Sequence, residues 1–215
     1  MIELAVKTVF SYLLGSLLGS LLLGRLTGRP DLRALGSGNP GSTNALRSYG
    51  KRLALGVAII DVGKGWLATR LVPTLVLPLS APAAVHNWMP AACGMAVMAG
   101  HVYPVWFRFR GGKGVATFFG AALGLAPQLA LAPLAVWLGV LLTTGYVGLA
   151  SVAAAASLPL CIAAIELRWH RPFLGFALFA AVVILLTHRA NIARMLEGSE
   201  PRARRPWELG RRAAS

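Results

Sequence analysis

Long apolar segments recur along this chain, and they constrain its fold more than any other feature of the sequence. Hydrophobic residues make up 56% of the 215 residues, and charged residues only 13%. A water-soluble domain of this length carries roughly 25% charged residues. The sequence therefore predicts an all-α, polytopic integral membrane helix bundle that forms a single domain over residues 1–215.

Seven transmembrane helices are expected. They cover about residues 4–23, 53–71, 83–99, 115–125, 129–146, 148–167 and 173–187. The segment at 115–125 is too short to cross in a straight line, so it is either a half-span that lines a polar cavity or a tilted crossing. Asp61 and Lys64 are three residues apart inside the second segment, so they share a helix face and can pair. Gly15 and Gly19 form a small-residue ridge in the first segment, which lets another helix approach closely.

Basic residues are concentrated in three of the stretches that connect or follow these segments. Most of the 21 lysine and arginine residues lie in the regions 25–52, 108–113 and 189–212. With seven crossings, these three regions share one face of the membrane. Because positive charge accumulates in cytoplasmic loops, the sequence predicts an N-terminus outside, a cytoplasmic C-terminus, and cytoplasmic loops at 36–50, 100–117 and 188–200.

A glycine-rich polar stretch at residues 36–47 follows the first segment and reads GSGNPGSTNALR. Its three glycines allow positive φ, so several backbone N–H groups can point toward one ligand. The Ser-Thr-Asn run at 42–44 supplies good N-cap residues, and a helix is expected to start just after it. The N-terminus of that helix, with Arg47 one turn inside, suits a phosphate group.

Two further polar stretches lie on the same predicted face. Residues 100–117 contain Gly-Gly-Lys-Gly before an apolar segment, so Lys113 and the N–H groups of a helix start can hold a phosphate together. His188 and Asn191 are three residues apart and share one helix face. Three polar stretches at one surface predict a common site that binds phosphates and stabilises a developing negative charge. His101 is either part of that site or a loop histidine bonded to backbone.

Other kinds of chemistry find little support in the sequence. The net charge of +14 comes from residues at the ends of apolar segments, so a nucleic-acid partner is not expected. Cys93 and Cys161 lie inside apolar segments, and their spacing suggests neither a disulfide nor a metal site. The chain has no G-x-S-x-G or H-E-x-x-H motif and few carboxylates, so we expect neither a metal nor a cofactor.

At these residues the chain resembles the bacterial membrane glycerol-3-phosphate acyltransferases that use acyl phosphate, the PlsY family. The resemblance spans the whole chain. The first motif, G-S-G-N-x-G-x-T-N-x-x-R, matches residues 36–47. The second, G-H-x-x-P and then F-K-G-G-K-G-x-A-T, matches residues 100–117 with Arg110 in place of the usual lysine. The third, H-R-x-N-I-x-R and then G-x-E, matches residues 188–200, and D-x-x-K-G is present at 61–65.

The resemblance implies a seven-helix enzyme of the bacterial cytoplasmic (inner) membrane, with its active site facing the cytoplasm. It would move a fatty acyl group from a long-chain acyl phosphate to the 1-hydroxyl of sn-glycerol 3-phosphate. The products would be lysophosphatidic acid and inorganic phosphate, in the first step of membrane phospholipid synthesis. The enzyme would work as a monomer in membrane lipid, without a cofactor.

The motifs also assign roles to individual residues. Those expected at the catalytic centre are Ser37, Arg47, Lys113, His188 and Asn191. Those expected to bind substrate are Gly36, Gly38, Asn39, Gly41, Thr43, Asn44, Gly111, Gly112, Gly114 and Thr117. The general base remains open between His188 and an oxygen of a substrate phosphate.

Two other functions fit parts of the sequence. A transporter or channel for an organic phosphate would use the spans and the anion-binding face, but it needs a site near the bilayer midplane. A membrane scaffold that binds anionic lipid through its basic tail would explain the charge, but it gives the glycine loops no role. Release of phosphate by the purified protein distinguishes an enzyme from both.

Overall fold

The protein is helical throughout the part that the computed structural model describes, residues 1–78, 82–164 and 171–203, and no strand occurs there. The longer helices are α1 (Ile2–Gly15), α4 (Lys51–Arg70), α5 (Ala83–Val102), α6 (Val115–Leu125), α7 (Pro127–Thr144), α8 (Val147–Ala164) and α9 (Arg171–Thr187). The shorter ones are α2 (Gly19–Leu26), α3 (Ser42–Ser48), α10 (Arg189–Leu196) and the 3-10 helices η1 (Leu32–Ala34), η2 (Val72–Thr74) and η3 (Val105–Phe107). The all-α prediction is confirmed for these ranges. The end of the sixth predicted segment and the basic tail beyond residue 203 lie outside the described residues.

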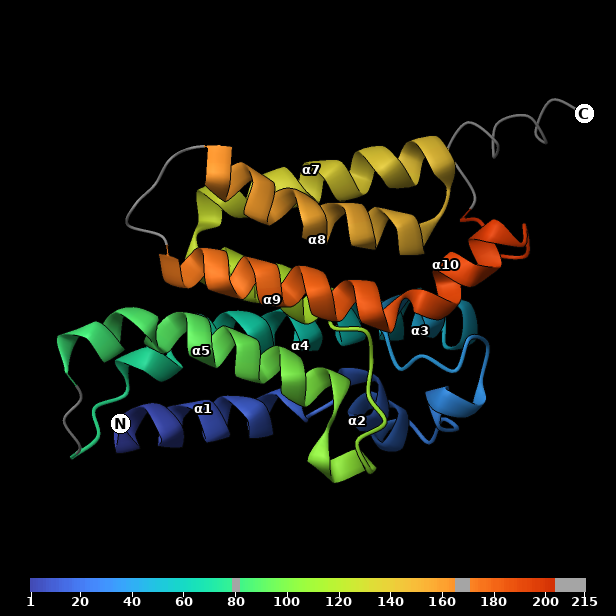
Figure 1. Cartoon of the computed structure of the whole chain (residues 1–215). Helices are drawn as coiled ribbons and strands as arrows, with labels where there is room; N and C mark the ends of the chain where they lie inside the picture. Colours follow the sequence, from blue (N-terminus) through green and yellow to red (C-terminus); the bar gives the residue numbers. More distant parts are fainter. Residues whose placement is uncertain (79–81, 165–170, 204–215) are drawn as a thin grey trace, which may run out of the picture.

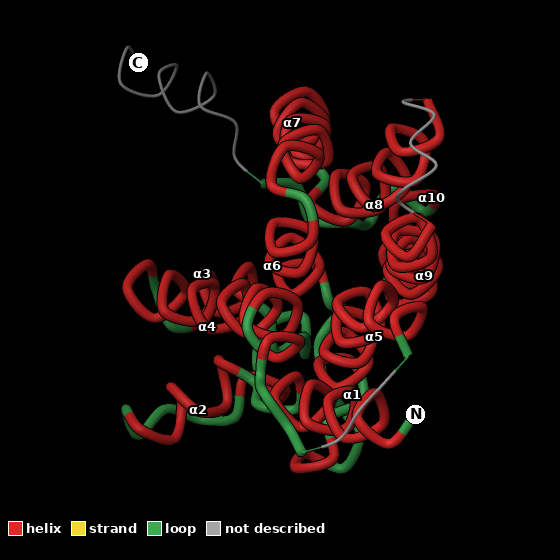
Figure 2. Tube along the Cα trace, turned by 90° about the vertical axis from the view of Figure 1, so that its left-hand side faces the viewer, coloured by secondary structure: helices red, strands yellow, loops and turns green. Residues whose placement is uncertain are grey.

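The long helices lie alongside one another (Figure 1), and α6 lies between α7 and α4 (Figure 2). The helix α6 contacts α4, α5, α7 and α9. On one side of the molecule α1 packs on α5, and on the other side α7 and α8 form a hairpin. The helix α9 packs against both α5 and α8, so it joins the two sides. The short helix α6 is thereby held on several sides, which fixes the loop that enters it.

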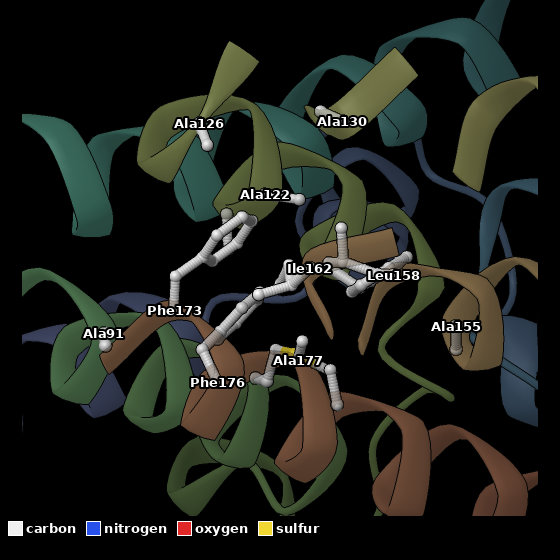
Figure 3. Packing of buried hydrophobic residues seen from close by; sticks show 14 of the residues in the cluster. Ala91, Ala122, Ala126, Ala130, Ala155, Leu158, Ile162, Phe173, Phe176 and Ala177 are labelled. Atoms are coloured by element: carbon white, nitrogen blue, oxygen red, sulfur yellow. The ribbon is translucent and has the colours of Figure 1, made fainter. Parts of the chain in front are cut away.

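An apolar core fills the space between α5, α6, α7, α8 and α9 (Figure 3). The ring of Phe176 stacks on Phe118 with 6.3 Å between centroids, and on Phe173 with 6.2 Å. Leu158 and Ile162 from α8 close the core from the other side and are buried. Alanines make up much of the remaining lining, so the helix backbones come close together.

Glycines bring the other helices into direct backbone contact. A Cβ at Gly15 would collide with the carbonyl of Val97, and one at Gly100 with the carbonyl of Tyr12, so α1 and α5 touch along glycines from both helices. Likewise α4 and α6 touch at Gly65 and Gly120. The predicted small-residue ridge of the first segment is confirmed at Gly15. Such contacts tolerate no side chain, because the opposing atoms belong to helix backbone.

Several of these helices are candidates for membrane spans. Among the residues that the structure describes, two helices, α7 and α8, are long and apolar enough to span a membrane alone. The number rises to four if the bent pairs α1–α2 and α9–α10 each count as one span. The helix α6 has the predicted bounds, and its 11 residues reach about 16 Å, roughly half of the hydrocarbon core. Seven crossings and their orientation stay predictions.

The first predicted segment is not one continuous helix. It breaks after Gly15, resumes at Gly19, and bends by 49°. The predicted pairing of Asp61 with Lys64 is confirmed, with 2.9 Å between Lys64 Nζ and Asp61 Oδ1. The pair packs against this break, so the charged side chains of α4 meet backbone groups that a continuous helix would have paired internally.

Candidate functional site

The three polar stretches of the sequence come together at one end of the bundle. In Figure 1 the end that carries α2, α3 and α10 also receives the loop that leads from α5 into α6. The opposite end carries the start of α1 and the turn η2. The structure therefore places the three stretches at one end of the bundle, and their position on the cytoplasmic face of the membrane stays a prediction.

The first stretch is organised by the side chain of Asn44, which is only 1% exposed. Its amide Nδ2 donates to the carbonyls of Leu32 (3.2 Å) and Leu35 (2.9 Å), and its Oδ1 accepts from the N–H of Ser37 (3.2 Å). Gly36 lies against the same amide with φ of +55°, where a Cβ would collide with Asn44 Oδ1. We expected Asn44 to shape a substrate pocket, but both amide protons are already donated to backbone, so it supports the loop from below.

The helix that follows this loop starts earlier than the sequence suggests. Residues 42–44 lie inside the first turn of α3, and the N-cap is Gly41, whose backbone is extended. The prediction that a Ser, Thr or Asn side chain caps the helix is therefore wrong. Gly38, with φ of +71°, and the half-buried Asn39 and Thr43 lie in the same loop and helix start. The side chains of Ser37 and Arg47 are exposed at this end of the bundle.

The second stretch closes back on the end of α5. The N–H of Gly111 donates to the Val102 carbonyl at 3.1 Å, and that of Gly112 donates to the His101 carbonyl at 3.0 Å. A side chain at Gly111 would collide with the carbonyl of His101, and one at Gly112 with its imidazole ring. The two glycines thus permit close packing. We expected their N–H groups to hold a phosphate, but both are occupied by backbone carbonyls.

Two further residues of this stretch were also expected to contact substrate. Gly114 is the N-cap of α6 and has φ of +84°, a left-handed conformation that favours glycine. Thr117 is fully buried in the first turns of α6. Its hydroxyl has no hydrogen-bond partner within the described ranges. Its carbonyl lies against Gly65 of α4, so Thr117 lies where α6 packs on α4.

The third stretch meets Lys113 through a chain of polar contacts. Lys113 Nζ donates to Asn191 Oδ1, and Asn191 Nδ2 donates to Glu200 Oε1 at 2.6 Å. The other oxygen of Glu200 accepts from Arg194 Nε at 2.7 Å. The hydroxyl of Thr187 donates to the Lys113 carbonyl at 3.2 Å, which ties the end of α9 to the start of α6. The immediate partner of the Lys113 ammonium is therefore a neutral amide.

The surroundings of Lys113 disfavour its charged form. The pKa of Lys113 is lowered to about 8: burial has the largest effect, the charge of Glu200 opposes it, and the charges of Arg194 and Arg47 add to it. The contribution of Arg47 means that the first stretch lies within electrostatic range of Lys113. A cationic region with a partly desolvated lysine attracts an anion, because an anionic ligand would restore the charge balance.

His188 is buried at the junction of α9 and α10. Its Nδ1 lies 2.8 Å from the carbonyl of Ile184. A carbonyl only accepts, so Nδ1 carries the proton and Nε2 keeps its lone pair. Burial, and next the charge of Lys113, lower the pKa of His188 to about 4. At neutral pH the ring is uncharged and can accept a proton.

The structure thus brings together four of the five residues expected at the catalytic centre: Arg47, Lys113, His188 and Asn191. Ser37 lies at the same end of the bundle, where its backbone N–H donates to Asn44 Oδ1. Glu200 was missing from the expected site, although the G-x-E motif at its position was a signal for it. Glu200 accepts hydrogen bonds from both Asn191 and Arg194, so it links these two side chains. Within the described ranges, no three His, Cys, Asp or Glu side chains gather to hold a metal ion.

A hollow of about 80 Å³ lies next to the first stretch, separate from Lys113. It is lined by Arg25, Arg29 and Arg33, with the ring of Phe107 among them. The guanidinium groups of Arg25 and Arg33 lie 5.6 Å and 5.8 Å from the centroid of that ring. Arg33 is also held by both oxygens of Asp31. The positive charge of this end therefore extends beyond the contacts of Lys113.

Comparison with known proteins gives a consistent set of similarities. A family model described as glycerol-3-phosphate acyltransferase matches residues 5–198. A glycerol-3-phosphate acyltransferase of Geobacter sulfurreducens is 42% identical over 206 residues, which cover 94% of this chain and 98% of that protein. One from Azotobacter vinelandii is 42% identical over 192 residues, covering 89% and 95%.

The fold is similar to solved structures as well. A crystal structure of PlsY, an integral membrane glycerol 3-phosphate acyltransferase, in its glycerol 3-phosphate form matches with a TM-score of 0.81 and 36% identity. The match covers 93% of this chain and 94% of that one. The lysophosphatidic acid form of PlsY matches with a TM-score of 0.80 and 35% identity over the same shares.

Proposed function

Because this chain belongs to the glycerol-3-phosphate acyltransferase family of integral membrane proteins, we propose that it moves a fatty acyl group from acyl phosphate to the 1-hydroxyl of sn-glycerol 3-phosphate. The products are lysophosphatidic acid and inorganic phosphate. The solved relative in its glycerol 3-phosphate and lysophosphatidic acid forms supports the identity of the acceptor and of the product. The donor is proposed from the three motifs.

One observation carries this proposal: the ammonium of Lys113 is bonded to the neutral amide of Asn191 rather than to a carboxylate. Arg47 and Arg194 add positive charge around it. Both proposed substrates carry phosphate, so a site with uncompensated positive charge suits either head group. Lys113 and Arg47 bind the phosphate of glycerol 3-phosphate, and Asn191 holds Lys113 in place.

The proposed reaction needs no covalent enzyme intermediate. The oxygen of the glycerol hydroxyl forms a bond to the acyl carbonyl carbon, and the bond from that carbon to the phosphate oxygen breaks. Inorganic phosphate leaves with the electron pair. The hydroxyl proton goes to His188 Nε2 or to an oxygen of a substrate phosphate. The geometry of His188 allows the first route, because Nδ1 donates to the Ile184 carbonyl and Nε2 keeps its lone pair, but its pKa of about 4 makes it a weak base at neutral pH.

Alignment of the two reactants supplies much of the rate in this mechanism. Holding reacting groups in the right geometry is worth roughly 7–11 kcal/mol of the barrier. Ser37 lies in a loop whose backbone is fixed by Asn44, so its hydroxyl is presented from a rigid support. Ser37 orients the glycerol hydroxyl toward the carbonyl carbon. Because Gly36, Gly38 and Gly41 have no side chains, acyl phosphate can approach the backbone of that loop.

The placement in the membrane belongs to the same proposal. The charge distribution supports seven crossings, with the N-terminus outside and the site at the cytoplasmic face of the bacterial inner membrane. The chain forms one domain and acts as a monomer. The lipid-tailed donor then reaches the site sideways from the bilayer, and glycerol 3-phosphate reaches it from the cytoplasm.

The test is turnover by purified protein in detergent or in a lipid mesophase. Given long-chain acyl phosphate and glycerol 3-phosphate, it should release one inorganic phosphate for each lysophosphatidic acid formed. Acyl-CoA or acyl carrier protein in place of acyl phosphate should give no product. Phosphate release without lysophosphatidic acid would overturn the assignment of the acceptor.

A transporter for an organic phosphate predicts a different result. Reconstituted in liposomes, a carrier would move labelled glycerol 3-phosphate across the bilayer and would release no phosphate from acyl phosphate. The polar stretches of this chain gather at one end of the bundle, whereas a carrier needs its site near the midplane. The geometry therefore favours the enzyme.

A further inference from the structure

A buried polar cluster lies beside the candidate site, and the proposed mechanism does not use it. It consists of Asp61 and Lys64, from the D-x-x-K-G motif on α4, and His101 near the end of α5. Their exposed fractions are 1%, 3% and 3%. Asp61 Oδ1 lies 2.9 Å from Lys64 Nζ and 3.6 Å from His101 Nδ1. Burying these charges is unfavourable unless they are well paired, so the cluster calls for an explanation.

One side of this cluster joins the broken halves of the first helix. Lys64 Nζ donates to the carbonyl of Gly15 at 2.9 Å and to that of Leu17 at 2.8 Å, at the end of α1. Asp61 Oδ1 accepts from the N–H of Gly19 at 3.4 Å, at the start of α2. A cation at a helix C-terminus and an anion at a helix N-terminus are both favourable. The direction of α2 is therefore fixed by α4.

The direction of α2 in turn places the first polar stretch. Ser20, one residue after the Asp61 contact, donates its hydroxyl to the carbonyl of Pro40 at 2.7 Å. Both groups are buried. Pro40 lies inside the loop that carries Ser37. A shift of α2 at its first turn would move that loop with it.

The other side of the cluster reaches the loop of Lys113. The imidazole of His101 lies where a side chain of Gly112 would be, and the His101 carbonyl accepts the N–H of Gly112 at 3.0 Å. Gly112 directly precedes Lys113. Gly65, which ends the D-x-x-K-G motif, lets the backbone of α4 touch that of α6 at Thr117. Two contacts thus fix Lys113, one through His101 and one through α6.

We propose that Asp61, Lys64 and His101 form a positioning cluster that sets the distance between the Ser37 loop and Lys113. This inference rests on the proposed function, in which these two parts of the site hold one substrate between them. The three residues touch no reacting atom. They act through the helix break on one side and through Gly112 on the other.

The chain offers a matched control for this proposal at the opposite end of the bundle. Glu3 and Lys7 on α1 form a second buried pair, with 2.6 Å between Lys7 Nζ and Glu3 Oε1. Lys7 Nζ also donates to a backbone carbonyl, that of Pro73, at 2.8 Å. The two pairs share their chemistry and burial. They differ in what they hold, because the Glu3–Lys7 pair ties α1 to η2 and touches neither half of the site.

The first experiment compares two double variants by kinetics. Asp61→Asn/Lys64→Met should lower kcat at least about tenfold with little change in KM for glycerol 3-phosphate, because misalignment by about 1 Å affects the reacting geometry most. Glu3→Gln/Lys7→Met should change kcat less than about twofold, although both variants lower the melting temperature. Equal effects of the two variants on kcat would refute the proposal. If the first variant does not purify folded, Asp61→Asn alone is held to the same criterion.

The second experiment measures the distance itself and does not depend on activity. Spin labels on Leu46→Cys and Arg110→Cys, in a background of Cys93→Ala and Cys161→Ala, report the separation between α3, which directly follows the Ser37 loop, and the loop of Lys113 in full-length protein. A single narrow distribution is expected for the parent and for Glu3→Gln/Lys7→Met, and a shifted or broadened one for Asp61→Asn/Lys64→Met. Identical distance distributions in the parent and the two double variants would refute the positioning role, whatever the kinetic result. A changed distribution in Asp61→Asn/Lys64→Met, combined with a parent protein that forms no lysophosphatidic acid, would refute the proposed function and leave the positioning intact.

Discussion

Two lysines at opposite ends of the bundle show how the same side chain is used for structure and for binding. Lys7 is 2% exposed and contacts the carboxylate of Glu3 and the carbonyl of Pro73. Lys113 is half-buried, and its side-chain partner is the neutral amide of Asn191. The nearby carboxylate, Glu200, is bonded to Asn191 and Arg194 instead.

The difference lies in where the charge is balanced. The charge of Lys7 is balanced by Glu3 within the fold, so this pair does not attract an anion to the end near η2. The charge of Lys113 is not cancelled by its direct partner, and Arg47 adds to it. A ligand phosphate can therefore gain an ionic interaction with Lys113, whereas Lys7 already makes one with Glu3.

The largest expected effect is that of removing the Lys113 ammonium. Lys113→Ala should lower kcat/KM by about 1000-fold, because a preorganised donor at a developing charge is worth roughly 100- to 1000-fold and the binding of phosphate is lost as well. The measurement is phosphate release by purified variant and parent at equal amounts of folded protein. Near-normal turnover would refute the role of Lys113 and with it the contrast between the two ends.

Ser37→Ala should have the next largest effect. Loss of a hydroxyl that contacts a charged or reacting group lowers kcat by roughly 10- to 100-fold. The loop should stay in place, because Asn44 holds it through backbone groups. Initial rates over a range of glycerol 3-phosphate concentrations separate kcat from KM. If KM alone rises, Ser37 is a binding residue outside the reacting centre.

A third change tests whether the packing of the Lys113 loop matters. Gly112→Ala places a methyl group into the ring of His101, so we expect kcat to fall about tenfold as Lys113 shifts. Gly139→Ala in α7 is the matched control, because a Cβ there meets no atom within 4 Å. Its activity should equal that of the parent, and its helix should be slightly stabilised. Equal activity of the two variants would show that the loop tolerates displacement.

The smallest expected effect is the pH dependence. Because burial lowers the pKa of Lys113 to about 8, the ammonium loses its proton as pH rises through that value, and anion binding weakens. The value of kcat/KM should fall roughly fourfold between pH 7 and pH 8.5. Lys113→Arg keeps its charge over this range, so its remaining activity should not fall. A fall of the same size in Lys113→Arg would assign the titration to another group.

Much of the site was readable from the sequence because its parts are local. The run from Gly111 to Gly114 before an apolar segment places a lysine at a helix start, and α6 begins at Val115 as expected. His188, the N-cap of α10, and Asn191 are three residues apart and share the first turn of that helix. The pairing of Asp61 with Lys64 follows from the same spacing. None of these features needs a distant partner to form.

The errors arose where a distant part of the chain decides. The first apolar segment looks continuous, but it breaks at Gly15 because Asp61 and Lys64 on another helix satisfy the freed backbone groups. The N–H groups of Gly111 and Gly112 looked free for phosphate, yet the end of α5 occupies them. The sequence did not show that the amide of Asn44 holds two carbonyls of its own loop; its part in a substrate pocket stays a prediction.

The sequence by itself determined that this chain is a helical membrane protein with three cationic, glycine-rich stretches, because composition and spacing act over a few residues at a time. Only the tertiary structure decided which of those groups remain available to a ligand. A buried donor or charge is satisfied by whichever partner the fold brings near it. Asn191 lies 78 residues from Lys113 and keeps it available, whereas Glu3, one turn away on the same helix, neutralises Lys7.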